Sequence, residues 1–369
     1  MGEPTNVPEA YQKLHERLAK NAEGAPAAAE LFEIFQILFT EEEARVGSQM
    51  PMLPSEFEEV QSAIGMDPEA LRGILGAMAD KGLVVDTDIR GKTVYMLAPP
   101  VIGFLEYTFM KRREDLPMKR LAELAHTYLH EHLLPVELEK VKTPRTRAVP
   151  YVSAFGGEMT SEVVPYEQAR ALIEQSGGGS LGACFCRMQE QLLGRGCDAP
   201  IDDICMGLGK GGEYLVKHGF ARPASVEELL DKLDEAEKLG LVHTCDNVQK
   251  RPVFMCHCCG CCCHLLRTIT EYDLRNMVAP SSFVATVDAE ACTACGICAD
   301  RCQIDAIDVD DIAQVNAERC IGCGVCVPEC PTEAVTLAKR PDAVEPAQNM
   351  MDLYMRLAAE KDRLKHFIG

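Results

Sequence analysis

The cysteines of this chain are confined to one stretch, and their distribution constrains the protein more than any other feature. None of the first 183 residues is a cysteine, whereas all 19 cysteines lie between Cys184 and Cys330. Free cysteines that serve only as small core residues would be scattered along the whole chain. The clustering therefore indicates metal or redox chemistry. It divides the chain into a cysteine-free N-terminal part, a cysteine-rich middle part and a cysteine-rich C-terminal part.

Two runs of cysteines near the C-terminus have the same spacing. Residues 292–302 read CTACGICADRC and residues 320–331 read CIGCGVCVPECP, so each contains C-x2-C-x2-C-x3-C, the run that wraps a [4Fe–4S] cubane. Gly296 and Gly324 occupy matching places, where they permit the unusual backbone angles of a tight ligand loop. The segments QIDAIDVDD and PTEAVTLAK, which follow the two runs, also match. The unit is therefore predicted to be an internal repeat.

This repeat resembles the bacterial-type two-[4Fe–4S] ferredoxins over about residues 284–339. The resemblance implies that the fourth cysteine of each run ligates the other cluster. One cluster is then held by Cys292, Cys295, Cys298 and Cys330, and the other by Cys302, Cys320, Cys323 and Cys326. Gln303 stands where the family usually has proline, which should loosen the turn without removing a ligand. Acidic residues outnumber basic ones around both runs and favour a low reduction potential.

The middle part holds eleven further cysteines, and its pattern resembles the extension found on poorly characterised 4Fe–4S proteins of anaerobes. That resemblance implies iron–sulfur electron transfer without a known substrate. The first four cysteines are predicted to form one self-sufficient cluster site, with Arg187 close enough to hydrogen-bond it or balance its charge: Cys184, Cys186, Cys197 and Cys205. Cys245 is isolated and is expected to bind no metal.

The segment MCHCCGCCCH (255–264) adds six cysteines, namely Cys256, Cys258, Cys259, Cys261, Cys262 and Cys263. Neighbouring cysteines in extended backbone point to opposite sides, so one metal cannot take all six. One division places Cys256, Cys259 and Cys262 or Cys263 at one cluster and Cys258 or Cys261 at a neighbour. Zinc is a rival for this part of the chain. His257 and His264 are expected to hydrogen-bond or pack rather than to bind metal. Up to four [4Fe–4S] clusters are expected in the whole chain.

The cysteine-free N-terminus shows helical periodicity over residues 27–39, 53–65 and 67–82, followed by two β-segments around a turn at Arg90-Gly91. This order resembles a winged helix over about residues 27–98. The last two of these helices are acidic, so repulsion by phosphates favours a protein-interaction or homodimerisation role over DNA binding. Further helices are predicted over residues 105–134, 224–243 and 346–369. The first continues the N-terminal part, the second joins the two middle cysteine groups, and the last is amphipathic.

The predicted fold class is therefore α+β with four parts: a helical, winged-helix-like interaction domain (1–140), a mixed cysteine-rich iron–sulfur module (141–283), a two-cluster ferredoxin domain (284–340) and a C-terminal amphipathic helix (341–369). The net charge of −20 argues against nucleic acid as a partner. No secretory signal and no run long enough to span a membrane is visible, which favours the cytoplasm. In that compartment clustered cysteines indicate metal or redox chemistry rather than disulfides.

These features predict an electron-transfer protein that relays low-potential electrons between redox partners, such as a flavoprotein or other oxidoreductase subunits. A subunit of a larger complex is favoured over a stand-alone catalyst, because neither G-x-G-x-x-G nor G-x-x-x-x-G-K-[ST] is present. Two alternatives remain. One is a redox-sensing winged-helix transcriptional regulator, and the other is an oxidoreductase whose middle cluster has an open iron that binds substrate.

Overall fold

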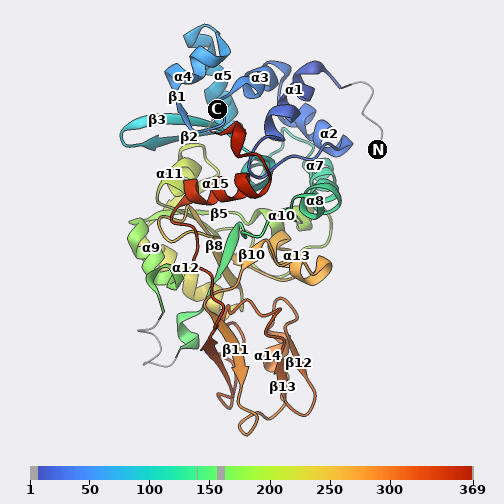
Figure 1. Ribbon diagram of the computed structural model, residues 1–369, viewed down its shortest axis with the longest axis vertical. Coiled ribbons are helices and arrows are strands. Elements are labelled where there is room, and N and C mark those ends of the chain that lie inside the picture. The colour runs from blue at the N-terminus through green and yellow to red at the C-terminus, as the bar shows by residue number, and fades with distance from the viewer. Residues whose placement is uncertain (1–6, 139, 156–162, 368–369) are drawn as a thin grey trace.

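The computed structural model describes residues 7–138, 140–155 and 163–367. Helices and strands are mixed along the chain, which agrees with the predicted α+β class. Figure 1 shows three regions stacked along the long axis: the N-terminal helices, a central sheet with helices around it, and the C-terminal repeat at the far end.

The N-terminal region packs helices around a small antiparallel sheet of order β1-β3-β2. Its elements are α1 (Glu9–Leu18), α2 (Ala29–Leu38), α3 (Glu41–Gln49), β1 (Ser55–Glu56), α4 (Phe57–Ile64), α5 (Pro68–Lys81), β2 (Val84–Ile89) and β3 (Lys92–Leu97). The three predicted helices correspond to α2, α4 and α5, and the predicted hairpin is β2–β3. Arg90 (φ 56°) and Gly91 (φ 81°) both adopt the left-handed conformation that a two-residue hairpin turn requires. Sequence periodicity did not predict α3 or β1.

The single helix predicted over residues 105–134 is interrupted. The structure contains α6 (Leu105–Met110), α7 (Met118–Thr127), a π-helical segment (Tyr128–Leu133) and α8 (Leu134–Leu138). Lys111 is extended at φ −111° and ψ 140°, so α6 ends there. Pro117 disfavours helical geometry at the residue before it, so α7 begins only after this proline.

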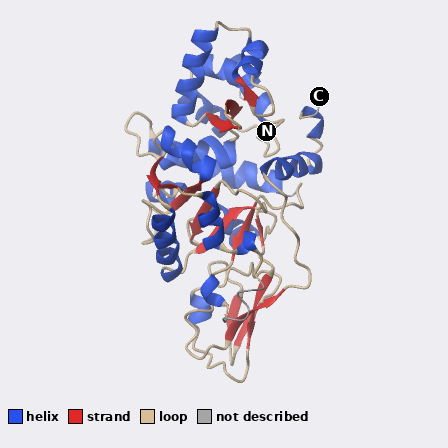
Figure 2. Ribbon diagram, turned by 90° about the vertical axis from the view of Figure 1, so that its left-hand side faces the viewer, coloured by secondary structure: helices blue, strands red, loops and turns tan. Residues whose placement is uncertain are grey.

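The central region is built on a seven-stranded sheet of order β10-β4-β8-β9-β6-β5-β7. Its strands are β4 (Thr146–Val149), β5 (Gly179–Gly182), β6 (Cys205–Leu208), β7 (Ala221–Ala224), β8 (Val242–Asp246), β9 (Phe254–Cys258) and β10 (Val278–Ala279). The helices of this region are α9 (Ala169–Ser176), α10 (Phe185–Leu192), α11 (Gly209–Lys217), α12 (Val226–Lys238) and α13 (His264–Tyr272). Figure 2 shows the sheet enclosed by helices.

Helices α9 and α12 cover one face of this sheet, and their apolar side chains share a core with Met206 and Met255. The predicted helix over 224–243 corresponds to α12. It begins as expected, because the Ser225 hydroxyl accepts a hydrogen bond from the Glu228 N–H at 3.2 Å. It is followed by Gly240, which has a φ of 71°. Side chains alternate along a strand, so Cys256, which follows Met255 in β9, points to the opposite face of the sheet. Cys258, two residues further along β9, points to the same face as Cys256.

His218, which follows α11, ties the central region to the N-terminal region. Its Nδ1 lies 2.7 Å from an Asp80 oxygen and its Nε2 lies 2.6 Å from an Asp86 oxygen. Burial alone would lower the pKa of His218, but the hydrogen bonds to Asp86 and Asp80 outweigh burial and raise this pKa.

A raised histidine pKa makes stability depend on pH in a definite direction. The stabilisation is fully present below the unfolded-state pKa of about 6.5 and is lost as pH rises through the folded-state pKa. We therefore expect the urea midpoint of the wild type to decrease as the pH is raised from about 6 to about 8.5, and to decrease more than the midpoint of His218→Gln does. Because Asp80 is exposed, the difference should be only about 1 kcal/mol. Identical pH profiles for the two proteins would show that this contact does not couple to folding.

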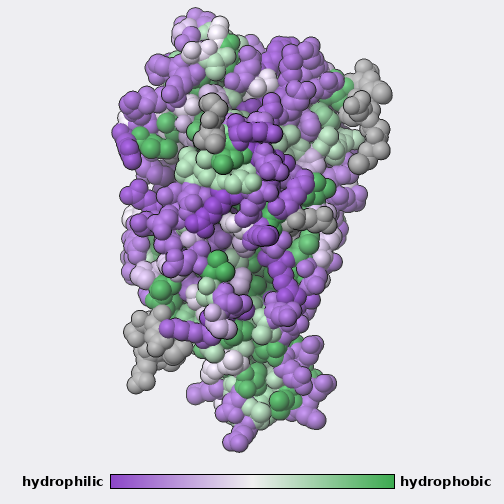
Figure 3. Space-filling view, viewed as in Figure 1, coloured by the Kyte–Doolittle hydropathy of each residue, from purple (hydrophilic) through white to green (hydrophobic). Residues whose placement is uncertain are grey.

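The C-terminal repeat consists of two small antiparallel ladders and one short helix: β11 (Phe283–Val287) with β14 (Val335–Lys339), β12 (Ile307–Val309) with β13 (Ala313–Val315), and α14 (Ile297–Asp300). Gly296 (φ 83°) and Gly324 (φ 77°) adopt the left-handed conformation that the sequence predicts for them. A space-filling view shows a largely hydrophilic surface in which hydrophobic residues are also visible at the end formed by this repeat (Figure 3).

After β14 the chain returns to the N-terminal region, as Figure 2 shows. The predicted amphipathic helix is α15 (Met350–Glu360), whose Leu353 and Leu357 are buried. Beyond it, Lys361 and Arg363 pair with the buried carboxylate of Glu137 at 2.9 and 2.7 Å. The apolar stripe of α15 therefore docks on the chain itself. None of the helices in the described ranges is long and apolar enough to cross a membrane.

Candidate metal centres

The first predicted cluster site is a pocket in the C-terminal repeat. Its lining includes three cysteines of the first run and one of the second: Cys292, Cys295, Cys298 and Cys330. The backbone N–H groups of Ala294 and Ala313 point at the Cys292 sulfur, at 3.5 and 3.4 Å. Backbone N–H groups directed at cysteine sulfurs are a means by which proteins tune iron–sulfur clusters. The residues around this pocket therefore fit a [4Fe–4S] cluster bound across the two runs.

The second predicted site has the reciprocal composition. The thiol of Cys302, from the first run, is an electrostatic neighbour of three thiols of the second: Cys320, Cys323 and Cys326. Burial and these neighbours raise the pKa of Cys326 to about 12 in the metal-free thiol form. The Ala306 N–H donates to the Cys302 sulfur at 3.2 Å. Because Cys298 is a further neighbour of Cys326, the two sites lie next to each other.

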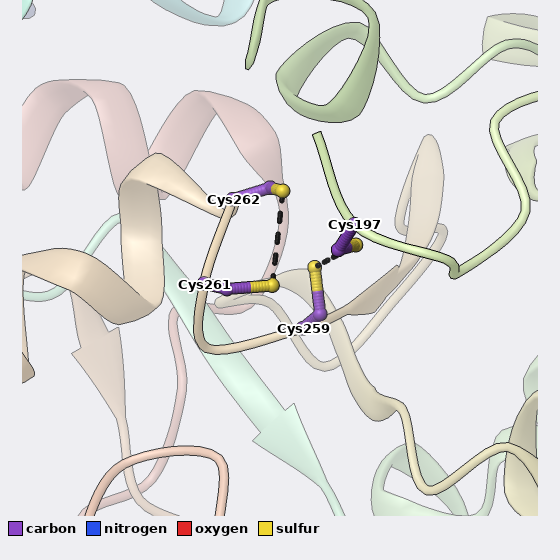
Figure 4. Close-up of side chains that lie close together, drawn as sticks. All are labelled: Cys197, Cys259, Cys261 and Cys262. Carbon is purple, nitrogen blue, oxygen red and sulfur yellow. Dashed lines mark hydrogen bonds between the residues drawn. The ribbon is translucent and has the colours of Figure 1, made fainter. Parts of the chain in front are cut away.

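Four cysteines of the middle part form a compact group, which we call the four-cysteine group: Cys197, Cys259, Cys261 and Cys262. All four sulfurs lie within 4.8 Å of one another. Figure 4 shows the four side chains converging from two segments, the loop after α10 and the turn between β9 and α13. Because residues 260–262 form a turn rather than extended backbone, the adjacent Cys261 and Cys262 reach the same centre.

Arg187 supplies positive charge at the four-cysteine group. Arg187 is 1 % exposed, and its Nε donates to the Cys259 sulfur at 3.4 Å. Its other nitrogens donate to the carbonyl oxygens of Pro200 and His257, both at 2.7 Å, which fixes the orientation of the side chain. A hydrogen bond from Cys262, together with this guanidinium, lowers the pKa of the Cys259 thiol to about 4. Cys259 is thus prepared to bind metal as a thiolate.

The remaining middle cysteines, apart from Cys245, lie along the other face of the central sheet. Each of their thiols interacts electrostatically with the next, and we call the set the thiol row: Cys184, Cys186, Cys263, Cys258, Cys256 and Cys205, in that order. Within the first four of the row, Cys184 also interacts electrostatically with Cys263 and Cys258. Cys256 and Cys205 continue the row across the ladder between β9 and β6.

Two helices begin at the thiol row. Cys184 is the N-cap residue of α10 and Cys263 is the N-cap residue of α13. The unpaired N–H groups at a helix N-terminus favour thiolates over thiols. Hydrogen bonds from Cys256 and Cys263 lower the pKa of Cys258 to about 5. The Thr244 hydroxyl lies 3.5 Å from the same sulfur. The row therefore offers four cysteine ligands in a largely buried setting. The thiol pKa is lowered at Cys184 and Cys258, whereas it is raised at Cys263 and, chiefly by burial, at Cys186.

This arrangement regroups the middle cysteines relative to the sequence prediction. Cys197 was grouped with Cys184, Cys186 and Cys205, but its sulfur lies among those of the segment 259–262 instead. Cys245 lies on the opposite face of the sheet and donates to the Asp246 carbonyl, away from both groups. His264 hydrogen-bonds Gln189 and His130, both at 2.9 Å, and His257 lies 2.8 Å from a nitrogen of His243. Both histidines thus have hydrogen-bond partners.

Gln303, the departure from the ferredoxin pattern, connects the repeat to the four-cysteine group. Its side-chain oxygen accepts a hydrogen bond from the Gly260 N–H at 2.7 Å, and its nitrogen donates to the Gly240 carbonyl at 3.2 Å. A side chain at Gly260 would collide with the Gln303 backbone oxygen. Tyr151 adds a second link, since its N–H donates to the Cys323 carbonyl at 3.0 Å. Sequence reasoning identified Gln303 only as a missing proline and did not predict this junction.

Comparison with known proteins supports the assignment of the C-terminal repeat. The family model described as 4Fe-4S binding domain matches twice, over residues 285–308 and 313–336. No curated protein and no solved structure gives a significant match to the chain. The prediction of a ferredoxin-type domain at the C-terminus is therefore confirmed. Together with the clustered cysteines, it makes this chain an iron–sulfur protein of the electron-transfer class.

Proposed function

We propose that this protein relays low-potential electrons between redox partners, as a subunit of a larger oxidoreductase complex in the reducing cytoplasm. The observation that carries the proposal is the pocket of the C-terminal repeat, where Cys330 of the second run joins the three cysteines of the first. When bound, [4Fe–4S] clusters accept and release single electrons. The chain's own residues hold these two sites, and Gln303 and Tyr151 join the repeat to the middle part.

The thiol row extends this proposal beyond the ferredoxin-type domain. We assign a third cluster to the first four cysteines of the row, namely Cys184, Cys186, Cys263 and Cys258. Three of them are buried, and the helix N-termini at Cys184 and Cys263 offset the negative charge of bound thiolates. This site lies in the middle part, whereas the first site of the repeat includes the exposed Cys295. A protein with sites at both places suits transfer between two partners, such as a flavoprotein and another oxidoreductase subunit.

The N-terminal region suits contacts with protein, including a second copy of this chain, better than contacts with DNA. Its element order resembles a winged helix, in which α5 would be the recognition helix. Two basic residues of α5 are already engaged: Lys81 pairs with Glu43 at 2.7 Å, and Arg72 lies over the Phe57 ring. The N-terminus of α5 carries Asp67 and Glu69. Phosphates would be repelled there, so nucleic acid is not the proposed partner.

A reductive titration of anaerobically purified full-length protein tests the proposed relay. Each cubane takes up one electron, so we expect about three electrons per chain at low potential. Cys184→Ser should lower the uptake to about two, because it removes a ligand of the thiol row and none of the repeat. Cys245→Ser is the matched control and should keep all three, because this buried cysteine contacts neither group. An unreducible wild-type protein would contradict the function. An equal loss in both variants would contradict the thiol-row assignment.

A further inference from the structure

The spacing of the sulfurs in the four-cysteine group is that of ligands around one ion. Cys197 and Cys259 have sulfurs 3.8 Å apart, and the sulfurs of Cys261 and Cys262 are 3.7 Å apart. A tetrahedral ion with metal–sulfur bonds of about 2.3 Å sets its ligands about 3.8 Å apart, because a tetrahedron's edge is about 1.63 times its centre-to-corner distance. These two sulfur–sulfur separations therefore match a single ion bound by four thiolates.

The cluster sites of the same chain provide an internal comparison. In a cubane each thiolate binds a different iron, so the four sulfurs lie further apart than they do around one ion. Within the described ranges, the four-cysteine group is the one set of at least three potential metal ligands whose donor atoms all lie within 4.8 Å of one another. Neither set of ferredoxin-type cysteines closes so tightly, and nor do the first four cysteines of the thiol row.

The local structure completes a closed site. Cys259 and Cys262 are buried, whereas Cys261 is exposed. The four sulfurs would fill all four positions around a tetrahedral ion and would leave no position for substrate or water. Sites with four cysteine ligands and no open position are typical of structural zinc. The buried guanidinium of Arg187 beside Cys259 offsets the net negative charge that four thiolates leave on a divalent ion.

We infer that Cys197, Cys259, Cys261 and Cys262 bind a single zinc ion rather than an iron–sulfur cluster. The ion pins the loop after α10 to the turn that precedes α13. Gly260 lies within that turn and bonds to Gln303, which directly follows the cluster ligand Cys302. The zinc thus rigidifies the junction at which the ferredoxin-type domain is attached to the middle part. This inference goes beyond the proposed electron relay and does not depend on it.

The first test uses the unaltered full-length protein, purified anaerobically. We expect one zinc per chain by elemental analysis. X-ray absorption at the zinc edge should show four sulfur ligands at about 2.3 Å and no nitrogen or oxygen ligand. Absence of zinc, or a mixed ligand shell, would overturn the inference. Because iron is measured in the same samples, a protein with zinc but no iron would contradict the electron relay and leave the zinc site standing.

The second test assigns the ion to these residues. Cys197→Ser should lose the zinc and keep the full iron content, since the Cys197 sulfur lies with those of Cys259, Cys261 and Cys262. Cys245→Ser is the control and should keep both metals. Loss of about four irons from Cys197→Ser would show that the group holds a cubane, and loss of one iron would show a mononuclear iron site. Either result would overturn the zinc assignment. If Cys197→Ser does not fold, the absorption spectrum of the unaltered protein still decides the matter.

Discussion

The double variant Cys292→Ser/Cys330→Ser is expected to lose only one of the two clusters of the ferredoxin-type domain, although it alters both cysteine runs. The reason is that Cys292 and Cys330 line the same pocket, so both substitutions fall on one site. Iron content should fall by about four per chain relative to the wild type. The spectroscopic signal of the second site, held by Cys320 and its partners, should persist.

The matched control is Cys292→Ser/Cys302→Ser, which alters two cysteines of the same run. Because Cys302 lies with the thiols of the second run, this pair damages both sites and should cost about eight irons. If each run instead bound its own cluster, the two results would be exchanged. Equal losses from the two double variants would show that the sites are not independent, and would contradict the separation proposed here.

Gly322→Ala is expected to destabilise the ferredoxin-type domain by about 3 kcal/mol or more, through steric conflict added to backbone strain. Gly322 has a φ of 66°, and an added Cβ would collide with the Phe283 carbonyl oxygen and the Ser281 hydroxyl. The Ser281 hydroxyl already donates to the Gly322 carbonyl at 2.7 Å, so it has no room to move away. Urea unfolding of the cluster-loaded protein should show a lower midpoint, and iron should be released at lower urea.

The repeat supplies its own control for this prediction. Gly296→Ala faces the same left-handed backbone, with a φ of 83°, but its Cβ would meet nothing within 4 Å, so a loss of only about 1 kcal/mol is expected. Ala294, the counterpart of Gly322 in the first run, already tolerates a φ of 54°. Positive φ alone is therefore acceptable at this place. If both glycine variants lose the same stability, backbone strain rather than the contact with β11 is responsible.

The cluster ligands of the repeat could be predicted because their chemistry is local. Each run carries three ligands within seven residues, and the fixed spacing itself dictates the loop. The same holds for α12, where Ser225 and Gly240 mark the two ends, and for the hairpin turn at Arg90-Gly91. In these cases the physical cause of the structure lies within the segment that forms it.

The grouping of the middle cysteines could not be predicted in the same way. Cys197 joins Cys259 across more than sixty residues, and nothing near Cys197 in the sequence identifies that partner. The argument that adjacent cysteines point apart holds in β9 but fails at Cys261 and Cys262, because the chain turns there. The junction at Gln303 could not be predicted either, because it depends on a tertiary contact with Gly260. Long-range packing therefore determines which thiols share a centre.

The central claim is that this chain is an iron–sulfur electron carrier, and counting iron and acid-labile sulfide in the anaerobically purified full-length protein tests it most directly. Two cubanes in the ferredoxin-type domain and one in the thiol row predict about twelve irons per chain and an equal amount of sulfide. Reduction should produce the paramagnetic signals of [4Fe–4S] clusters. Protein that folds with zinc in place of iron at the eight cysteines of the repeat, and without sulfide, would contradict the account.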